Sequence, residues 1–257
     1  MKMGSRAENR GWNRGRRAPS SWITTVLARR FRRRLESGRG ALQEHLPHTN
    51  APTTRRSTAY SVFKRVLDVT LSAAFLIVLG IPIALIGLLI KLEDPSAPVL
   101  FRQPRCGANG RRINVLKFRT MVKDADALKE GLREQSVVAW PDFRLYDDPR
   151  VTRLGRFLRT ASLDELPQLV NVLIGDMSLV GPRPTSFDVS TYKLWHTGRL
   201  DYRPGITGPW QVLGRDSMDF DERCRLEIQF FRRPSLLAEL KLLLATVTIV
   251  FRRTGTA

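Results

Sequence analysis

One stretch of the chain, residues 69–90 (VTLSAAFLIVLGIPIALIGLLI), is apolar throughout and carries no charged side chain. As a straight helix, roughly 22 residues reach about 33 Å, which is enough to cross the hydrocarbon core of a bilayer. A buried helix of a soluble protein usually shows a polar stripe, and this run has none. Pro82 follows Gly80 near its middle, where a proline removes one backbone hydrogen bond and kinks a helix. The pattern predicts a kinked membrane helix over about residues 66–91.

The charges on both sides of this run indicate how it lies in a bilayer. Lys64 and Arg65 precede it, Lys91 follows it, and further arginines come soon afterwards. Positive flanks prefer the cytoplasmic side, and a simple crossing would export one of them. A kinked helix that enters and leaves through the same face satisfies both flanks, so we expect a re-entrant helix in a monotopic membrane protein. A single crossing with the short N-terminal part outside is the alternative, since spanning helices tolerate proline.

The rest of the chain alternates short strand patterns with helix patterns. Pro98–Phe101 and residues 112–118 read as strands, and residues 104–110 between them have the composition of a turn. We therefore expect a short β-hairpin. Helical spacing is found at Ala125–Gln135, Pro167–Ile174 and Leu236–Phe251. The last of these is too short to span a membrane, and it either lies on the surface of one or packs on the core. The expected fold class is α+β, mainly helical, with amphipathic helices at the membrane surface.

Composition adds a strongly basic N-terminal tail. The chain has 43 Lys and Arg against 24 Asp and Glu, a net charge of +19. Such an excess requires a polyanionic partner: nucleic acid, anionic lipid or a phosphorylated substrate. Residues 1–58 hold little apolar mass and are predicted to be largely disordered, ahead of one domain at 59–257. Within the tail, Trp22–Leu35 is interpreted as a short basic helix on anionic lipid, or else as a solvated or RNA-binding segment. Cys106 and Cys224 lack metal-ligand spacing and predict no disulfide framework.

Two adjacent carboxylates, Asp164 and Glu165, stand just before a predicted helix. Ser162 with Glu165 would form a capping box if the helix began there. Pro167 argues against that interpretation, because it would then fall past the first turn and delete a hydrogen bond. A helix that begins at Pro167 leaves both carboxylates near an N-terminus, where the helix dipole and free N–H groups favour anions such as phosphate. Adjacent residues do not share one helix face, so we expect one carboxylate to attack and the other to hold a metal.

Several cations lie in loop-like positions, two of them next to prolines. Arginine matches phosphate oxygens with a planar fork, and proline reduces the entropy lost when a side chain is held. Each of these residues taken alone is more simply a surface ion pair, but together with the two carboxylates they suggest a diphosphate site. Because Mg²⁺ is usually held by one or two carboxylates and substrate phosphates, it is the expected metal. The candidate cations are Arg119 in Lys117–Met121, Arg159, Arg183 between two prolines, and Arg203 before a third.

These features resemble the bacterial sugar transferases, the monotopic polyprenyl-phosphate phosphoglycosyl transferases. The resemblance runs from about Ser61 to Arg253 and rests on a series of ordered motifs. They are KRVLD (64–68), APVLFRQPRCGANG (97–110), KFRTM (117–121), DDPRVTRLGRFLRTASLDELPQLVNVLIGDMSLVGPRP (147–184), YRPGITGPWQV (202–212) and LKLLL (240–244). The sequence departs from the family pattern at Ile81, where serine is frequent before the proline, and at Pro234 and Glu239 near the C-terminus.

The resemblance implies a specific reaction and setting. A sugar 1-phosphate would pass from a UDP-sugar donor to polyprenyl (undecaprenyl) phosphate, with release of UMP, in two steps and with Mg²⁺. It implies a bacterial inner-membrane enzyme with a cytosolic active site, acting in exopolysaccharide, capsule or O-antigen synthesis. By position, Asp164 would be the nucleophile and Glu165 its partner at the metal. The substrate-binding residues would be Lys117, Arg119, Arg159, Arg183 and Arg203, and the membrane-interface residues Lys64, Arg65, Asp68 and Pro82.

Two other classes of protein compete with this interpretation. A membrane-tethered nucleic-acid-binding protein would explain the net charge and the arginine-rich tail, but not the adjacent carboxylates or the arginines beside prolines. We therefore expect no nucleic-acid partner. A non-catalytic scaffold of the same family would be expected to lack the carboxylate pair, which is present here. The sequence leaves the identity of the sugar and homo-oligomerisation open.

Overall fold

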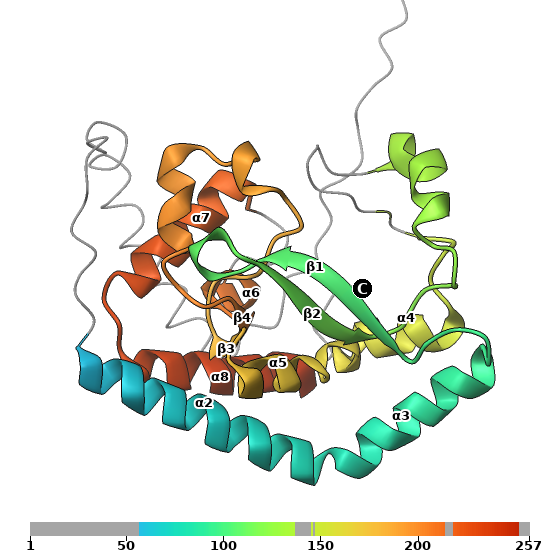
Figure 1. Cartoon of the computed structure of the whole chain (residues 1–257), viewed down its shortest axis with the longest axis horizontal. Coiled ribbons are helices and arrows are strands. Elements are labelled where there is room, and N and C mark those ends of the chain that lie inside the picture. Colours follow the sequence, from blue (N-terminus) through green and yellow to red (C-terminus); the bar gives the residue numbers. More distant parts are fainter. Residues whose placement is uncertain (1–56, 137–144, 146, 214–217, 252–257) are drawn as a thin grey trace, which may run out of the picture.

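The computed structural model describes residues 57–136, 145, 147–213 and 218–251. The predicted basic tail, with the helix expected at Trp22–Leu35, lies outside the described residues except for its last two positions. The described part is mainly helical and holds two small two-stranded sheets (Figure 1). The predicted α+β, mainly helical composition is therefore confirmed.

Helices α2 (Thr58–Val78) and α3 (Gly80–Glu93) form a broken pair that runs along one side of the molecule as a wide V (Figure 1). Their axes differ by 62°. Pro82 explains the break, because it has no N–H for the carbonyl of Val78 and its ring crowds that same carbonyl. The helix consequently ends one turn before the proline. The kink predicted near Pro82 is confirmed, whereas the helical segment begins eight residues earlier than the predicted residue 66.

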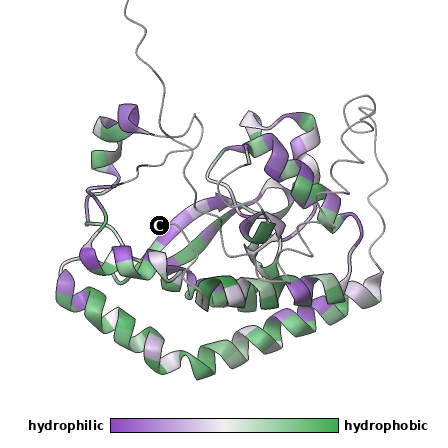
Figure 2. Cartoon of the chain, turned by 180° about the vertical axis from the view of Figure 1, so that it is seen from behind, coloured by the Kyte–Doolittle hydropathy of each residue, from purple (hydrophilic) through white to green (hydrophobic). Residues whose placement is uncertain are grey.

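No single helix in the described part of the chain is both long and apolar enough to cross a bilayer, whereas α2 and α3 together meet both criteria. Figure 2 shows α3 and the adjoining half of α2 as mostly hydrophobic. A re-entrant path through a membrane stays a prediction for this pair. The large apolar side chains that the pair leaves exposed are Val62, Phe63, Val66, Phe75, Ile77, Val78, Ile81, Leu85, Leu88, Leu89 and Leu92.

Strands β1 (Leu100–Cys106) and β2 (Arg112–Phe118) form the predicted hairpin and pair antiparallel from Leu100–Phe118 to Cys106–Arg112. The bounds predicted for the first strand, Pro98–Phe101, were wrong at both ends. The strand in the structure begins two residues later and continues through Pro104, a residue predicted to lie in the turn. Cys106 donates its N–H to Thr185 on the side away from β2, at 2.9 Å. Pro104 lies two residues before Cys106, so its backbone groups point to the same outer side of the strand. The missing N–H of this proline therefore costs no hydrogen bond to β2. The turn is shortened to the residues between the strands, with η1 (Ala108–Gly110) inside it.

The remaining elements pack over the V and build the main core. Strands β3 (Ser178–Val180) and β4 (Gly205–Thr207) form a second, parallel pair. The other helical elements are η2 (Ala127–Gln135), α4 (Arg153–Thr160), η3 (Leu163–Glu165), α5 (Gln168–Ile174), η4 (Val189–Thr191), η5 (Leu194–Arg199), α6 (Pro209–Leu213), α7 (Phe220–Phe231) and α8 (Leu236–Phe251). The core lies where β2, β3, α5, α7 and α8 meet, and includes Val115, Val172, Met177, Phe231 and Leu242.

The final helix, α8, has the predicted bounds and packs on the core, which is one of its two expected placements. Its placement on a membrane surface stays a prediction. Leu242 and Ala245 are buried in the molecule. Leu237 and Leu244, on another face, are 62 % and 56 % exposed. One face of α8 therefore packs on the core and leaves a second apolar face uncovered by the described residues.

Three polar residues at the start of α2 bind this helix to the domain above it. Lys64 donates to the carbonyl of Val180 and pairs with Glu239 of α8. Arg65 donates to the carbonyls of Val172 and Leu173 in the last turn of α5, at 2.6 and 2.7 Å. The buried carboxylate of Asp68 accepts from the Leu179 N–H at 3.1 Å. These predicted membrane-interface residues thus make contacts within the protein, and contact between them and lipid stays a prediction.

Candidate active site

The local sequence around Asp164 and Glu165 produces a sharp turn between two short helices. Ser162 has a φ of +57°, in the left-handed region, so α4 stops before it. Asp164 and Glu165 follow in the 3₁₀ turn η3, and Pro167 occupies the N-cap position of α5. Ser162 makes no side-chain cap, so the capping-box alternative is wrong and the helix start predicted from Pro167 is confirmed within one residue. The carboxylates therefore lie in the approach to α5.

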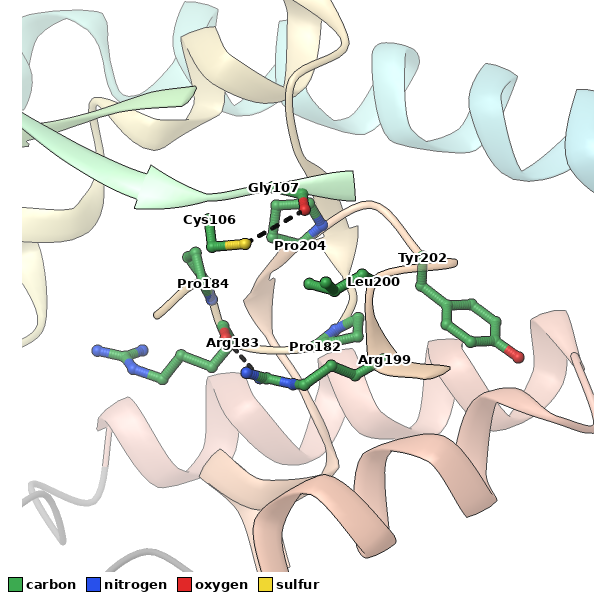
Figure 3. A pocket seen from close by; sticks show the side chains of 9 residues that line it. All are labelled: Cys106, Gly107, Pro182, Arg183, Pro184, Arg199, Leu200, Tyr202 and Pro204. Atoms are coloured by element: carbon green, nitrogen blue, oxygen red, sulfur yellow. Dashed lines mark hydrogen bonds between the residues drawn. The ribbon is translucent and has the colours of Figure 1, made fainter. Parts of the chain in front are cut away.

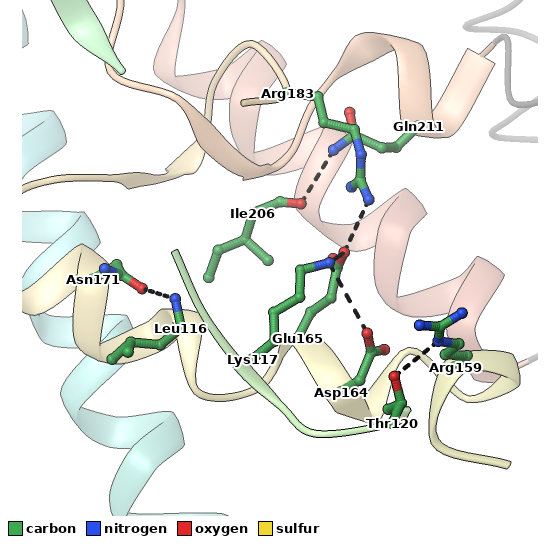
Figure 4. A network of polar contacts seen from close by, with 10 residues as sticks. All are labelled: Leu116, Lys117, Thr120, Arg159, Asp164, Glu165, Asn171, Arg183, Ile206 and Gln211. Atoms are coloured by element: carbon green, nitrogen blue, oxygen red, sulfur yellow. Dashed lines mark hydrogen bonds and ion pairs between the residues drawn. The ribbon is translucent and has the colours of Figure 1, made fainter. Parts of the chain in front are cut away.

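Helix α4 supplies Arg159 to the site through a close backbone contact. A Cβ built on Gly155 would lie 2.1 Å from the carbonyl oxygen of Thr120, so only glycine allows this approach. One turn further along α4, Arg159 donates from Nε to Thr120 Oγ1 at 2.9 Å (Figure 4). Thr120 follows Lys117 at the end of β2. The strand and the helix thus each bring one cation, Lys117 and Arg159, to the neighbourhood of Asp164 (Figure 4).

Lys117 connects the two carboxylates (Figure 4). Its Nζ donates to Glu165 Oε1 at 3.1 Å and lies 4.0 Å from Asp164 Oδ2. Arg183 donates from Nη2 to the same Oε1 of Glu165 at 3.0 Å. The structure therefore brings together five residues that the sequence predicted for the site: Asp164, Glu165, Lys117, Arg159 and Arg183.

The two carboxylates differ in their electrostatic environment. Burial raises the pKa of Asp164, and Lys117 opposes this effect. Burial also disfavours the charged form of Glu165, but the charges and hydrogen bonds of Arg183 and Lys117 outweigh it and hold the pKa of Glu165 well below its usual range. Glu165 is consequently a permanent anion at neutral pH. Asp164 is a desolvated and more basic carboxylate, which suits a nucleophile.

Arg183 extends from a loop between Pro182 and Pro184, as the sequence suggested. Its guanidinium lies 5.8 Å from the ring centre of Trp210, and that of Arg223 lies 4.4 Å from the same ring. Trp210 was not singled out by sequence reasoning, although it falls within the motif at 202–212. The signal that would have found it is an aromatic residue in a motif that already supplies a candidate arginine.

A small cleft lies behind this loop and is lined by Cys106, Arg199, Leu200 and Tyr202, among others (Figure 3). Its interior accommodates about one water molecule, which is far too little for a nucleotide. The cleft is therefore part of the packing behind Arg183 rather than a substrate pocket.

Two predicted substrate-binding arginines do not join the cluster. Arg119 donates to the carbonyl of Pro98 at 2.9 Å and lies over the Phe101 ring. Arg203 is exposed, and the structure gives its side chain no hydrogen bond to the described residues of the site. Their proposed contact with substrate stays a prediction.

The carboxylates fit Mg²⁺ only as part of a site completed by substrate. In the described part of the chain, no three His, Cys, Asp or Glu side chains are grouped closely enough to hold a metal ion by themselves. Lys117 and Arg183 both contact Oε1 of Glu165, which leaves Oε2 as the oxygen available to a metal. Mg²⁺ commonly takes one or two carboxylates together with substrate phosphates and water. The donor set is therefore suitable for a metal that arrives with a diphosphate.

Residues 59–253 match the family model described as bacterial sugar transferase. This match covers the hairpin, the carboxylate turn and the Arg183 loop. The chain belongs to the bacterial sugar transferase family, as the resemblance predicted.

Three relatives illustrate the similarity. The chain is 40 % identical over 199 residues, 77 % of its length, to the galactosyl transferase CpsE of Streptococcus agalactiae, of which it covers 44 %. It is 39 % identical over 209 residues, 78 % of its length, to the undecaprenyl-phosphate galactose phosphotransferase of Salmonella typhimurium, of which it covers 42 %. It is 40 % identical over 248 residues to the UDP-glucose:undecaprenyl-phosphate glucose-1-phosphate transferase of Caulobacter vibrioides, a match that covers 89 % of this chain and 88 % of that protein. The chain thus spans less than half the length of the first two and most of the third.

Proposed function

We propose that this chain transfers a sugar 1-phosphate from a UDP-sugar to undecaprenyl phosphate and releases UMP. The observation that carries the proposal is the pairing of a desolvated carboxylate, Asp164, with a permanently ionised one, Glu165, among Lys117, Arg159 and Arg183. The family membership and the printed names of the relatives, which include glucose and galactose phosphotransferases, support the same reaction.

In the first step, an Asp164 carboxylate oxygen attacks the β-phosphorus of the donor. The bond between that phosphorus and the oxygen bridging to the α-phosphate breaks, and UMP leaves with the electron pair. The product is a sugar phosphate joined to Asp164 as an acyl phosphate. A carboxylate nucleophile divides one difficult displacement into two easier ones. Lys117 and Arg183 are placed to neutralise charge on the diphosphate as it develops.

In the second step, a phosphate oxygen of undecaprenyl phosphate attacks the same phosphorus. The bond to Asp164 breaks, the carboxylate is restored, and the product is an undecaprenyl diphosphate sugar. Glu165 would hold Mg²⁺, which supplies additional positive charge at the phosphates when it is bound. Because Glu165 is already ionised at neutral pH, no proton has to leave it before a cation binds.

The broken pair α2 and α3 is proposed to hold the enzyme in the inner membrane. Its exposed apolar side chains run along the pair from Val62 to Leu92, and the polar residues Lys64, Arg65 and Asp68 lie on α2 toward the catalytic layer. A re-entrant path would place both ends of the pair on the cytosolic side, next to a polyprenyl phosphate whose tail is in the bilayer. The pathway is proposed to be synthesis of exopolysaccharide, capsule or O-antigen, in line with relatives named for exopolysaccharide production.

The test uses the full chain in detergent or nanodiscs with Mg²⁺, undecaprenyl phosphate and a panel of UDP-sugars, and measures UMP. Asp164→Asn should abolish release, whereas Asp147→Asn, at a side chain 85 % exposed, should not change it. Without acceptor, the wild type should release about one UMP per enzyme and gain the mass of one sugar phosphate on the peptide that contains Asp164. Release that persists in Asp164→Asn would remove this residue as the nucleophile. Absence of release with every sugar, in folded protein, would contradict the proposed reaction.

A further inference from the structure

A buried ion pair joins η5 to α7 directly behind the Arg183 loop. Arg199 of η5 and Glu227 of α7 are 4 % and 1 % exposed, and Arg199 Nη2 lies 2.6 Å from Glu227 Oε2. Arg199 also donates from Nε to the same carboxylate oxygen at 2.8 Å. Neither side chain contacts Asp164 or Glu165 in the described structure. Any part that this pair takes in the reaction must therefore pass through other residues.

The pair contacts both polar groups of the Arg183 main chain. The N–H of Arg183 donates to Glu227 Oε1 at 2.9 Å, and its carbonyl accepts from Arg199 Nη2 at 2.7 Å (Figure 3). Pro182 and Pro184, on either side, have no N–H of their own to fix the loop. The two charged side chains therefore hold both polar groups of Arg183 itself, while the neighbouring carbonyls of Pro182 and Thr185 accept from the N–H groups of Gly205 and Cys106.

Stability alone is a weak explanation for these two charges. Taking an ion pair out of water has a desolvation cost that often equals the attraction between the charges, and apolar residues of similar volume frequently serve as well. An apolar pair would, however, leave the N–H and carbonyl of Arg183 without these partners. Positioning of Arg183 is what the charged pair supplies and a hydrophobic pair would not.

We propose that Arg199 and Glu227 are positioning residues that fix the main chain of Arg183 so that its guanidinium reaches Glu165 and the donor diphosphate. The contact with Glu165 is the 3.0 Å hydrogen bond described above. The contact of Arg183 with the donor diphosphate rests on the proposed function, whereas the position of its backbone rests on the hydrogen bonds alone. Tyr192 extends the arrangement, since its hydroxyl accepts from Arg199 Nη1 at 3.2 Å and bonds to Thr185, two residues after Arg183.

The first test does not depend on activity. Because both neighbours of Arg183 are prolines, hydrogen exchange at its amide is measured in isolation from adjacent amides. Glu227→Gln leaves Arg199 as an unpaired buried charge and can fail to fold, so the main variant is Arg199→Met with Glu227→Leu. This double variant should keep a cooperative unfolding transition and exchange the Arg183 amide at least about tenfold faster than the wild type. An Arg183 amide equally protected in the folded double variant would overturn the proposal.

A matched control breaks another contact between the same two elements. Asp221 of α7 bonds to His196 of η5 at 2.9 Å and makes no contact with the Arg183 main chain. Asp221→Asn should therefore leave exchange at Arg183 unchanged. Equal acceleration of exchange in this control would show that general loosening of η5 against α7, rather than the ion pair, governs the loop, and would overturn the proposal.

The second test is a mutant cycle with Arg183→Ala. In the wild-type background, the Arg199→Met, Glu227→Leu change should lower kcat/KM for the UDP-sugar by about 10²-fold, as expected for misplacement by about 1 Å. The KM for undecaprenyl phosphate should change by less than about twofold. In the Arg183→Ala background, the same change should cost no further activity, because its effect passes through Arg183. Equal losses of kcat/KM in both backgrounds would overturn the proposal. A wild type without transferase activity would contradict the proposed function, and the hydrogen-exchange result would then decide the positioning role.

Discussion

Replacement of Gly155 by alanine tests how closely α4 approaches the end of β2. In an exposed helix this change normally stabilises a protein by up to about 1 kcal/mol, because glycine is the poorer helix former. At Gly155 the new Cβ would lie 2.1 Å from the carbonyl oxygen of Thr120 and 2.7 Å from its carbon. Both atoms belong to the backbone, so no side chain can turn away. Carbon–oxygen contacts in proteins rarely fall below about 3.3 Å, so the helix must move by roughly 1 Å.

Two consequences follow from that movement. Overpacking of this size costs about 1–3 kcal/mol of stability, which lowers the Tm of a domain of this length by about 2–12 °C. Arg159, one turn along α4, would also move away from Thr120 Oγ1, to which it now donates at 2.9 Å. Because a displacement of about 1 Å in a catalytic site can cost about 10²-fold in rate, we expect UMP release to fall well beyond the loss of folded protein.

Thermal unfolding and UMP release would be measured on Gly155→Ala and on Gly131→Ala side by side. A Cβ added at Gly131 would have no described atom within 4 Å, so alanine there meets open space. This control should keep the wild-type Tm or raise it slightly. If Gly155→Ala behaved like the control in both measurements, the close approach of α4 to Thr120 would be refuted.

Three further predictions concern other parts of the molecule. Arg65→Ala removes two hydrogen bonds to carbonyls in the last turn of α5 and should lower the free energy of unfolding by about 1–3 kcal/mol, measured by denaturation in detergent. Arg111→Ala, at a side chain 69 % exposed, should cost less than about 0.5 kcal/mol, and equal losses would contradict the structural role of Arg65. Because burial raises the pKa of Asp164, ionisation of this side chain above the raised pKa lowers the stability of the folded protein. Asp164→Asn should therefore have a higher Tm than the wild type near pH 7, and the difference in Tm should shrink as the pH falls through the raised pKa. A difference in Tm that does not depend on pH would contradict this. Burial raises the pKa of the Cys106 thiol, and it also raises the pKa of the Cys224 thiol, in that case to about 12. Iodoacetamide at pH 8 should therefore label neither cysteine before unfolding, as measured by mass spectrometry. Labelling of the native protein would disprove their burial.

The sequence was most informative where one residue type limits the backbone. Pro82 predicted the break in the long apolar segment, and Pro167 predicted the start of α5 and the placement of Asp164 before it. Both inferences follow from the missing N–H of proline and hold in any tertiary context. The predicted end of the first strand was wrong because a proline such as Pro104 is also tolerated where its backbone faces the outer side of an edge strand. The sequence alone does not show which side of the strand faces outward.

By itself, therefore, the sequence determined the mainly helical composition, the broken apolar helix, the hairpin and the identity of the candidate chemical groups. Only the tertiary structure decided which cations meet the carboxylates: Lys117, Arg159 and Arg183 reach the cluster, while Arg119 turns to Pro98 and Arg203 stays exposed. It also decided that Arg199 and Glu227 lie behind Arg183. The physical reason is that periodicity and turn chemistry act between neighbours in sequence, whereas these contacts join residues 16 to 48 positions apart, whose approach depends on how the whole core packs.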